Sequence, residues 1–289
     1  MRVESYYAIG FCKIEDYELE SFGLFEAGVV SLEELESENG GCVSFKFYTD
    51  TKEGRDRIVT EFPHLNFECG EEEARDWDLW WRERQTPVKV SESLWVRPPW
   101  VNFSALNPGD TVLALEAKTA FGTGEHSSTA LAAQLMENVD FNGKNVLDIG
   151  TGTGILSLYA LKRNAKFAVQ TEIDPFTISC LLENFEQNGE EPPNAVLGFL
   201  DSFKDGVKFD IIVCNMLRSE VLPIRADIER LLVHGGKFIL SGQFECEKHF
   251  ILDWFKEAGF KVCREVICEE WWAVLCLSEF RQFSNLLLR

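Results

Sequence analysis

The sequence predicts an α/β protein with a doubly wound, mostly parallel seven-stranded sheet, preceded by a small ferredoxin-like α+β domain. Two observations carry this prediction. From about residue 144, near-continuous apolar runs alternate with amphipathic stretches, which is typical of parallel strands covered by helices on both faces. Residues 1–70 instead follow the order strand, helix, strand, strand, helix, strand, which is that of the split βαβ arrangement.

Composition restricts the class of protein. The 289 residues include 48 acidic and 28 basic side chains, for a formal net charge of −20. Such a chain is expected to repel nucleic acid and anionic membranes and to attract basic partners, unless the charge only aids solubility. No apolar run approaches the ~20 residues that span a bilayer, and no signal peptide is evident. The nine cysteines lack CxxC spacing, so we expect no metal site, no disulfide framework and a cytoplasmic location.

The first domain is expected to span residues 1–70. Its strands are expected at residues 2–12, 29–32, 42–48 and 65–69. A helix is expected at 15–27, with Leu19, Phe22 and either Leu24 or Phe25 on its buried stripe. A second helix is expected to begin at the N-cap Thr51 and to end near residue 62.

Residues 71–88 are interpreted as a linker helix that carries Trp77, Trp80 and Trp81 on one side. That side either docks on a neighbouring part of the chain or serves a partner. The second domain is set at residues 89–278, and the tail at 279–289 has no assigned role. Strands of the second domain are expected at 144–149, 167–172, 194–200, 209–216, 237–242, 260–268 and 271–277. Helices are expected at 155–164, 176–188, 219–232 and 246–259.

A glycine loop, LDIGTGTGIL, follows the first of these strands and opens a helix. Its spacing is G-x-G-x-G, whereas a dinucleotide fingerprint would place a glycine where Ile155 stands. This disfavours a nicotinamide-dependent oxidoreductase. Glu172 ends the next strand, where a carboxylate can accept hydrogen bonds from both ribose hydroxyls. Together the loop, the acidic strand end and the alternating pattern predict a nucleoside site at the carboxyl edge of the sheet.

The motifs also resemble a known family. LDIGTGTGIL with TEIDP is similar to class I S-adenosylmethionine-dependent methyltransferases, and AFGTGEHSSTA resembles a loop of the PrmA family, which trimethylates ribosomal protein L11. DWDLWWRERQTPVKVSESLWVRPPW, CNML and EEWWAVLCL extend the resemblance. The sequence departs from the family pattern at 116–118, at Glu125 and at Met216, and of the family's threonine pair it keeps only Thr129. These departures bear on the methyl acceptor more than on the cofactor.

The resemblance implies S-adenosylmethionine as the cofactor. The glycine loop in AFGTGEHSSTA, which comes first in the chain, would fold over the methionine end of the cofactor. The second loop, in LDIGTGTGIL, would cradle its base. The residues expected to bind it are Phe121, Thr123, Thr129, Asp148, Gly150, Gly152, Glu172, Asp201 and Asn215. Simpler roles stand beside some of these. Thr129 would otherwise cap a helix, Asp201 would be a surface turn residue, and Asn215 would end a strand. His126, in the first loop, either braces that loop or accepts a proton.

The resemblance further implies methyl transfer to lysine side chains or the N-terminal amine of a basic large-subunit ribosomal protein, L11. Asn215 is the expected catalytic residue, because its side-chain oxygen and the carbonyl of Met216 can accept hydrogen bonds from an amine. We assign no general base and expect water to take the proton. The alternatives are a lysine methyltransferase of a different protein and a non-catalytic homologue that only binds the cofactor.

Overall fold

The computed structural model describes residues 4–35, 41–73, 82, 84–105, 107–116, 118 and 120–279. The chain forms two compact units, Met1–Arg84 and Gln85–Arg289. The three tryptophans of the predicted linker helix and residues 280–289 of the tail lie outside the described residues. Among the residues described, no helix has the length and apolar character needed to cross a bilayer.

The first unit has a four-stranded sheet with the order β2-β3-β1-β4, and each pair of neighbours is antiparallel. Its main elements in chain order are β1 (Glu4–Lys13), α1 (Tyr17–Glu26), β2 (Ser31–Leu35), β3 (Cys42–Thr49), α2 (Lys52–Glu61) and β4 (Glu68–Glu73). This order of elements and strands confirms the predicted ferredoxin-like arrangement. The last strand lies later than expected, because residues Pro63–Leu65 form a turn of 3₁₀-helix.

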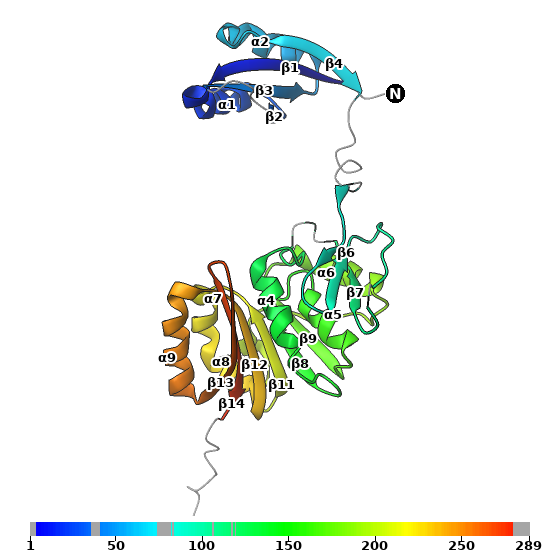
Figure 1. The fold of residues 1–289 in the computed structure, drawn as a ribbon, viewed down its shortest axis with the longest axis vertical. Coiled ribbons are helices and arrows are strands. Elements are labelled where there is room, and N and C mark those ends of the chain that lie inside the picture. The colour runs from blue at the N-terminus through cyan, green and yellow to red at the C-terminus, as the bar shows by residue number, and fades with distance from the viewer. Residues whose placement is uncertain are drawn as a thin grey trace, which may run out of the picture. The chain divides into compact units, whose positions relative to one another are not determined.

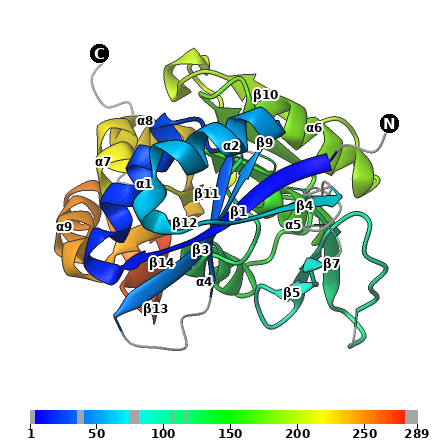
Figure 2. The same cartoon turned by 90° about the horizontal axis from the view of Figure 1, so that it is seen from above.

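Helices α1 and α2 lie side by side and share one core with β1 and β3 (Figure 2). Leu24 of α1 is fully buried in this core, but Leu19 and Phe22 are 75% and 63% exposed. The predicted buried stripe of α1 is therefore wrong in these two positions. The helix packs instead through Tyr17, Leu24 and the small residues near them, since a Cβ at Gly23 would already lie 3.2 Å from the ring of Phe62.

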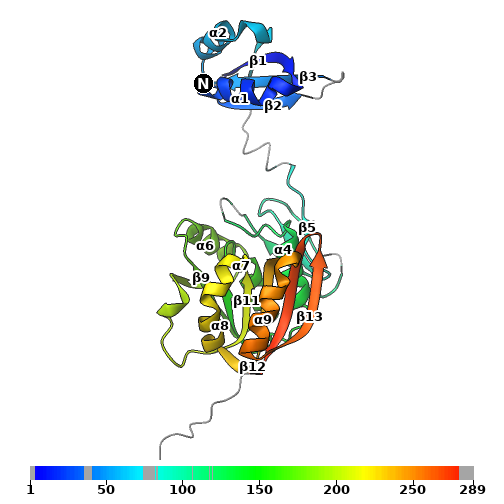
Figure 3. The same ribbon diagram turned by 90° about the vertical axis from the view of Figure 1, so that its left-hand side faces the viewer.

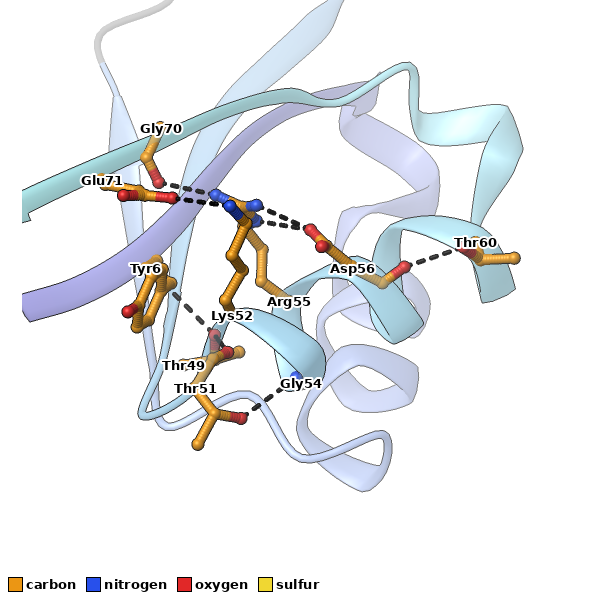
Figure 4. Close-up of polar contacts among 10 residues, drawn as sticks. All are labelled: Tyr6, Thr49, Thr51, Lys52, Gly54, Arg55, Asp56, Thr60, Gly70 and Glu71. Atoms are coloured by element: carbon orange, nitrogen blue, oxygen red, sulfur yellow. Dashed lines mark hydrogen bonds and ion pairs between the residues drawn. The ribbon is translucent and has the colours of Figure 1, made fainter.

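Helix α2 begins as the sequence predicts. The Oγ1 atom of Thr51 accepts a hydrogen bond from the backbone N–H of Gly54 at 3.1 Å, which caps the helix. Arg55 of α2 is buried and donates to Asp56 and, at 3.0 Å, to the carbonyl of Gly70 in β4 (Figure 4). The guanidinium thus ties α2 to the edge of the sheet.

The second unit is built on a seven-stranded sheet with the order β10-β9-β8-β11-β12-β14-β13. Its strands are β8 (Asn145–Ile149), β9 (Phe167–Glu172), β10 (Asn194–Leu197), β11 (Phe209–Asn215), β12 (Leu232–Phe244), β13 (Phe260–Cys268) and β14 (Trp271–Ser278). Within this sheet, β14 runs antiparallel to both of its neighbours and the other pairs are parallel. This confirms the predicted doubly wound, mostly parallel sheet.

Two cores cover the two faces of this sheet. The helices of the second unit are α4 (Ser127–Met136), α5 (Ile155–Lys162), α6 (Thr177–Gln187), α7 (Arg218–Val221), α8 (Arg225–Leu231) and α9 (Lys248–Ala258). Side chains of α4, α5 and α6 fill one core, and those of α7, α8 and α9 fill the other (Figures 1 and 3). The helix expected at 219–232 is broken, because Pro223 in its middle lacks an N–H and ends α7.

A small sheet of order β5-β6-β7, which the sequence did not predict, precedes α4. Its strands are β5 (Val88–Lys89), β6 (Leu94–Arg97) and β7 (Thr111–Ala114). Val90, Leu94, Val96 and Leu113 from this segment are buried in the same core as α4 and α5. The segment therefore packs against the first glycine loop, residues 120–126. A Cβ at Gly124 in that loop would lie 2.6 Å from the side chain of Val90.

Candidate active site

The two glycine loops of the sequence contact each other at the carboxyl edge of the sheet. Thr153 donates from its backbone N–H to the carbonyl of Phe121 at 3.0 Å and from its hydroxyl to the carbonyl of Gly122 at 2.7 Å. Gly152 has φ +54°, and a Cβ there would lie 2.3 Å from the carbonyl oxygen of Phe121. Only glycine permits this approach. The first loop is therefore built directly on the second.

Asp148 anchors the second glycine loop through hydrogen bonds. Its Oδ2 atom accepts hydrogen bonds from the hydroxyl of Thr151 at 2.7 Å and from the backbone N–H and hydroxyl of Ser157 at 3.1 and 2.8 Å. Asp148 is 1% exposed. Burial raises the pKa of its carboxyl group, and the hydrogen bonds from Thr151 and Ser157 partly oppose that rise. The residue thus joins the loop to the first turn of α5.

Glu172 is held at the end of β9 by three backbone N–H groups. Its Oε2 atom accepts from Gly152 at 3.1 Å, and its Oε1 atom accepts from Ile173 at 2.8 Å and Asp174 at 3.2 Å. These bonds fix the carboxylate beside the glycine loop. Oε1 thus has both of its lone pairs occupied, whereas Oε2 keeps one with which it can accept from a ligand hydroxyl.

A cavity of about 780 Å³ extends along the carboxyl ends of the parallel strands, a volume suited to a small-molecule ligand. The residues that line it include Phe121, His126, Ser128, Gly150, Gly152, Glu172, Ile173, Asp174, Gly198, Phe199, Leu200, Asn215, Leu217, Glu220, Gly242 and Trp271. The structure thus brings Phe121, Gly150, Gly152, Glu172 and Asn215 of the predicted set together around one cavity.

The other four predicted residues do not line this cavity. Thr123 is exposed in the first loop, where its hydroxyl accepts from the backbone N–H of Glu125 at 3.3 Å. Asp201 is exposed in a 3₁₀ turn, directly after the lining residue Leu200. Asp148 lies behind the loop and Thr129 is fully buried. Their expected contacts with a cofactor stay predictions.

Asn215 is the last residue of β11, and its amide has a defined orientation. Its Nδ2 atom donates to the hydroxyl oxygen of Thr129 at 3.3 Å, which leaves Oδ1 as an acceptor at the cavity. Thr129 lies inside α4, whose N-cap is His126, so the alternative that Thr129 caps the helix is wrong. Thr129 instead orients the expected catalytic side chain.

His126 braces the first loop. Its Nδ1 atom accepts from the backbone N–H of Ser128 at 3.2 Å and lies 2.8 Å from the hydroxyl oxygen of the same residue. The ring packs edge to face between Phe121 and Trp271, with centroid distances of 5.3 and 4.8 Å. These contacts favour the bracing interpretation over a role as proton acceptor.

Sequence reasoning missed several lining residues. Gly242 ends the predicted strand at 237–242, so the rule that ligands bind at carboxyl ends could have found it. Trp271 begins the antiparallel strand β14 and reaches the same edge only because that strand is reversed. Trp271 could therefore be assigned to this edge only from the order and direction of the strands in the sheet. Within the described ranges, no group of three His, Cys, Asp or Glu side chains is placed to hold a metal ion.

Comparison with known proteins identifies the family. A model of the family described as ribosomal protein L11 methyltransferase (PrmA) matches residues 23–278. The chain belongs to the PrmA family. It is 30% identical over 215 residues to the ribosomal protein L11 methyltransferase of Desulforamulus reducens, which covers 74% of this chain and 69% of that protein. It is 32% identical over 209 residues to that of Chromohalobacter salexigens, covering 72% and 68%.

A solved structure supports the same assignment. The ribosomal protein L11 methylase of Lactobacillus delbrueckii subsp. bulgaricus is 26% identical, with a TM-score of 0.61, and the match covers 66% of this chain and 97% of that one. The predicted resemblance to the PrmA family is thereby confirmed. PrmA proteins are methyltransferases that use S-adenosylmethionine, and the chain is an enzyme of this class.

The cavity of this PrmA chain fits S-adenosylmethionine. Beside the carboxylate of Glu172, the large apolar side chains Ile173 and Phe199 are 62% and 65% exposed and line the cavity. Apolar surface exposed inside a cavity is suited to be covered by a ligand, here the faces of a purine base. The glycine loops and Phe121 close the cavity at the β8 end.

Proposed function

We propose that the protein transfers methyl groups from S-adenosylmethionine to amines of a basic ribosomal protein, ribosomal protein L11. The relatives described above are ribosomal protein L11 methyltransferases, and this supports L11 as the substrate. The observation that carries the proposal is Asn215, whose oriented amide oxygen lies at the cavity that the glycine loops enclose. The net charge of −20 suits a lysine-rich partner.

In this proposal, the residues at the β9 end hold the nucleoside. Oε2 of Glu172 accepts a hydrogen bond from a ribose hydroxyl, and Ile173 and Phe199 contact the base. The loop of Gly150 and Gly152 allows close approach, since glycines there present no side chain to the ligand. Phe121 covers the opposite end and excludes water from it.

At the acceptor end, Asn215 aims the amine. S-adenosylmethionine, when bound, would supply an electrophilic methyl group on its sulfonium. Oδ1 of Asn215 accepts a hydrogen bond from the neutral amine and directs its lone pair along the line of displacement. A lysine amine has a pKa near 10.4, so it must lose a proton before it reacts. Water takes this proton, as the sequence predicts.

The test is methyl transfer by the purified chain. Labelled S-adenosylmethionine is incubated with the protein and with isolated ribosomal proteins, and mass spectrometry identifies the modified residues. We expect label on lysine or on the N-terminal amine of L11. Label on another protein would favour the alternative lysine methyltransferase. Cofactor binding without transfer to any protein would favour a non-catalytic homologue.

Asn215→Ala tests the role of the amide. We expect kcat to fall about 100-fold, because the amine loses its orienting acceptor, while the Kd for S-adenosylmethionine changes little. Asn145→Ala is the matched control, since Asn145 begins β8 at the opposite edge of the same sheet and lies away from the cavity. Equal turnover of the two variants would remove Asn215 from the mechanism.

A further inference from the structure

A fully buried glutamine lies next to the expected catalytic turn. Gln243 is the second-last residue of β12 and has no exposed surface. Its Nε2 atom donates to the carbonyl of Met216 and, at 3.3 Å, to the carbonyl of Ser241, and its Oε1 atom has no hydrogen-bond partner among the residues that the structure describes. Burying an amide that is only half satisfied costs stability. The hydrogen bond to the Met216 carbonyl offsets part of this cost.

Both backbone polar atoms of Met216 form hydrogen bonds with residues of β12. Its N–H donates to the carbonyl of Ser241 at 3.2 Å, and its carbonyl accepts from Gln243. Gly242 has φ +79°, and a Cβ there would lie 2.8 Å from the Met216 carbonyl and 2.9 Å from Oδ1 of Asn215. The turn after β11 therefore rests directly on the end of β12.

The side chain of Asn215 depends on this support. Thr129 fixes its Nδ2 atom from one side, but the backbone that carries Asn215 continues into Met216. The Met216 carbonyl and Oδ1 of Asn215 both lie close to Gly242, so we expect a shift of this turn to displace both oxygens together. In active sites a displacement of about 1 Å can cost about 100-fold in rate.

We propose that Gln243 is a positioning residue for methyl transfer, which holds the Met216 carbonyl so that Oδ1 of Asn215 faces the methyl-accepting amine. The inference rests on the proposed function. Gln243 itself does not line the cavity.

The chain offers a matched control for a merely space-filling role. Gln170 of β9 is also fully buried, and neither atom of its amide has a partner. Both glutamines lie in the same sheet, but Gln170 is two strands away from the turn of Met216. Replacing each with leucine removes the amide and keeps a side chain of similar size.

The first experiment compares Gln243→Leu and Gln170→Leu in the full chain with L11 as acceptor. We expect Gln243→Leu to lower kcat about 100-fold with little change in the Kd for S-adenosylmethionine. Gln170→Leu should keep the wild-type kcat. If both variants lose turnover equally, or if Gln243→Leu keeps it, the positioning role is wrong and the methyltransferase function stands.

The second experiment uses Gln243→Glu and the pH dependence of turnover. A carboxyl group at 243 can donate to the Met216 carbonyl only when it is protonated, and burial raises the pKa of such a group. Wild-type turnover should rise with pH as the acceptor amine loses its proton. The ratio of variant to wild-type kcat should therefore fall as pH rises from 6 to 9. A constant ratio would contradict the proposal.

A third measurement does not depend on activity. Amide hydrogen exchange of the backbone N–H groups of Met216 and Leu217 should be faster in Gln243→Leu than in wild type or Gln170→Leu, because the turn loses its anchor. Equal exchange in the three proteins overturns the positioning role. Absence of methyl transfer by the wild-type protein to any protein overturns the proposed function instead, so the two failures are distinguishable.

Discussion

Asp148 shows how a single buried carboxyl group should link pH to stability. Burial raises its pKa in the folded chain above the unfolded value near 3.9. The neutral acid is therefore favoured on folding, and its contribution to stability is full at low pH and lost as pH rises through the folded pKa. Each tenfold increase in proton affinity corresponds to about 1.4 kcal/mol.

Asp148→Asn should remove this pH-dependent loss. The asparagine oxygen still accepts from Thr151 and Ser157, and its Nδ2 lies beside Gln170, which is paired in register on β9 and has an unpartnered oxygen. We expect the melting temperature of the variant to exceed that of wild type at pH 8, with the difference shrinking toward pH 4. Lower stability of the variant at pH 8 would mean that an ionised carboxylate serves the loop better.

At the scale of residues, the sequence predicted those positions whose chemistry is local. Glu172 ends one apolar strand and Gly150 directly follows another, and an acidic side chain or a glycine at a strand end has few other uses. Gln243 and Trp271 could not be found in this way, because their roles depend on which strand lies beside β11 and on the reversal of β14. Local patterns carry no information about either.

At the scale of elements, α1 provides the sharpest test of packing. Leu24 is fully buried in the core of the first unit, whereas Phe22, two residues earlier, is 63% exposed. Leu24→Ala should destabilise this unit by about 2–5 kcal/mol through loss of buried surface and formation of a cavity. Phe22→Ser should change stability by no more than about 0.5 kcal/mol. Calorimetry of the full chain measures both.

If Phe22→Ser proved as damaging as Leu24→Ala, the helix would pack through the stripe that the sequence indicated. That stripe was mispredicted because α1 has apolar side chains on more than one side, so periodicity alone does not choose between them. The choice is made by Gly23, which lets the ring of Phe62 approach. The seven strands of the large sheet were predicted near their observed positions because most are near-continuous apolar runs, which leave no face to choose, whereas the short strands β5, β6 and β7 were not predicted.

At the scale of the whole molecule, the dominant property is charge. Both units of the chain are rich in acidic residues, and the chain as a whole carries a net charge of −20. Ribosomal proteins that contact RNA are basic, so attraction over distances of about 10 Å should raise the rate of encounter. The cofactor site is a different case, because it is a cavity lined by many apolar side chains and glycines.

This difference predicts a salt dependence that separates the two ligands. Raising NaCl from 50 to 300 mM should increase the KM for L11 about tenfold, because salt screens the long-range attraction between the acidic surface and the basic acceptor. The Kd for S-adenosylmethionine, measured by calorimetry in the same buffers, is the control and should change little. A KM for L11 that is flat over this range would assign the excess charge to solubility alone, and specificity for the acceptor would then rest on short-range contacts.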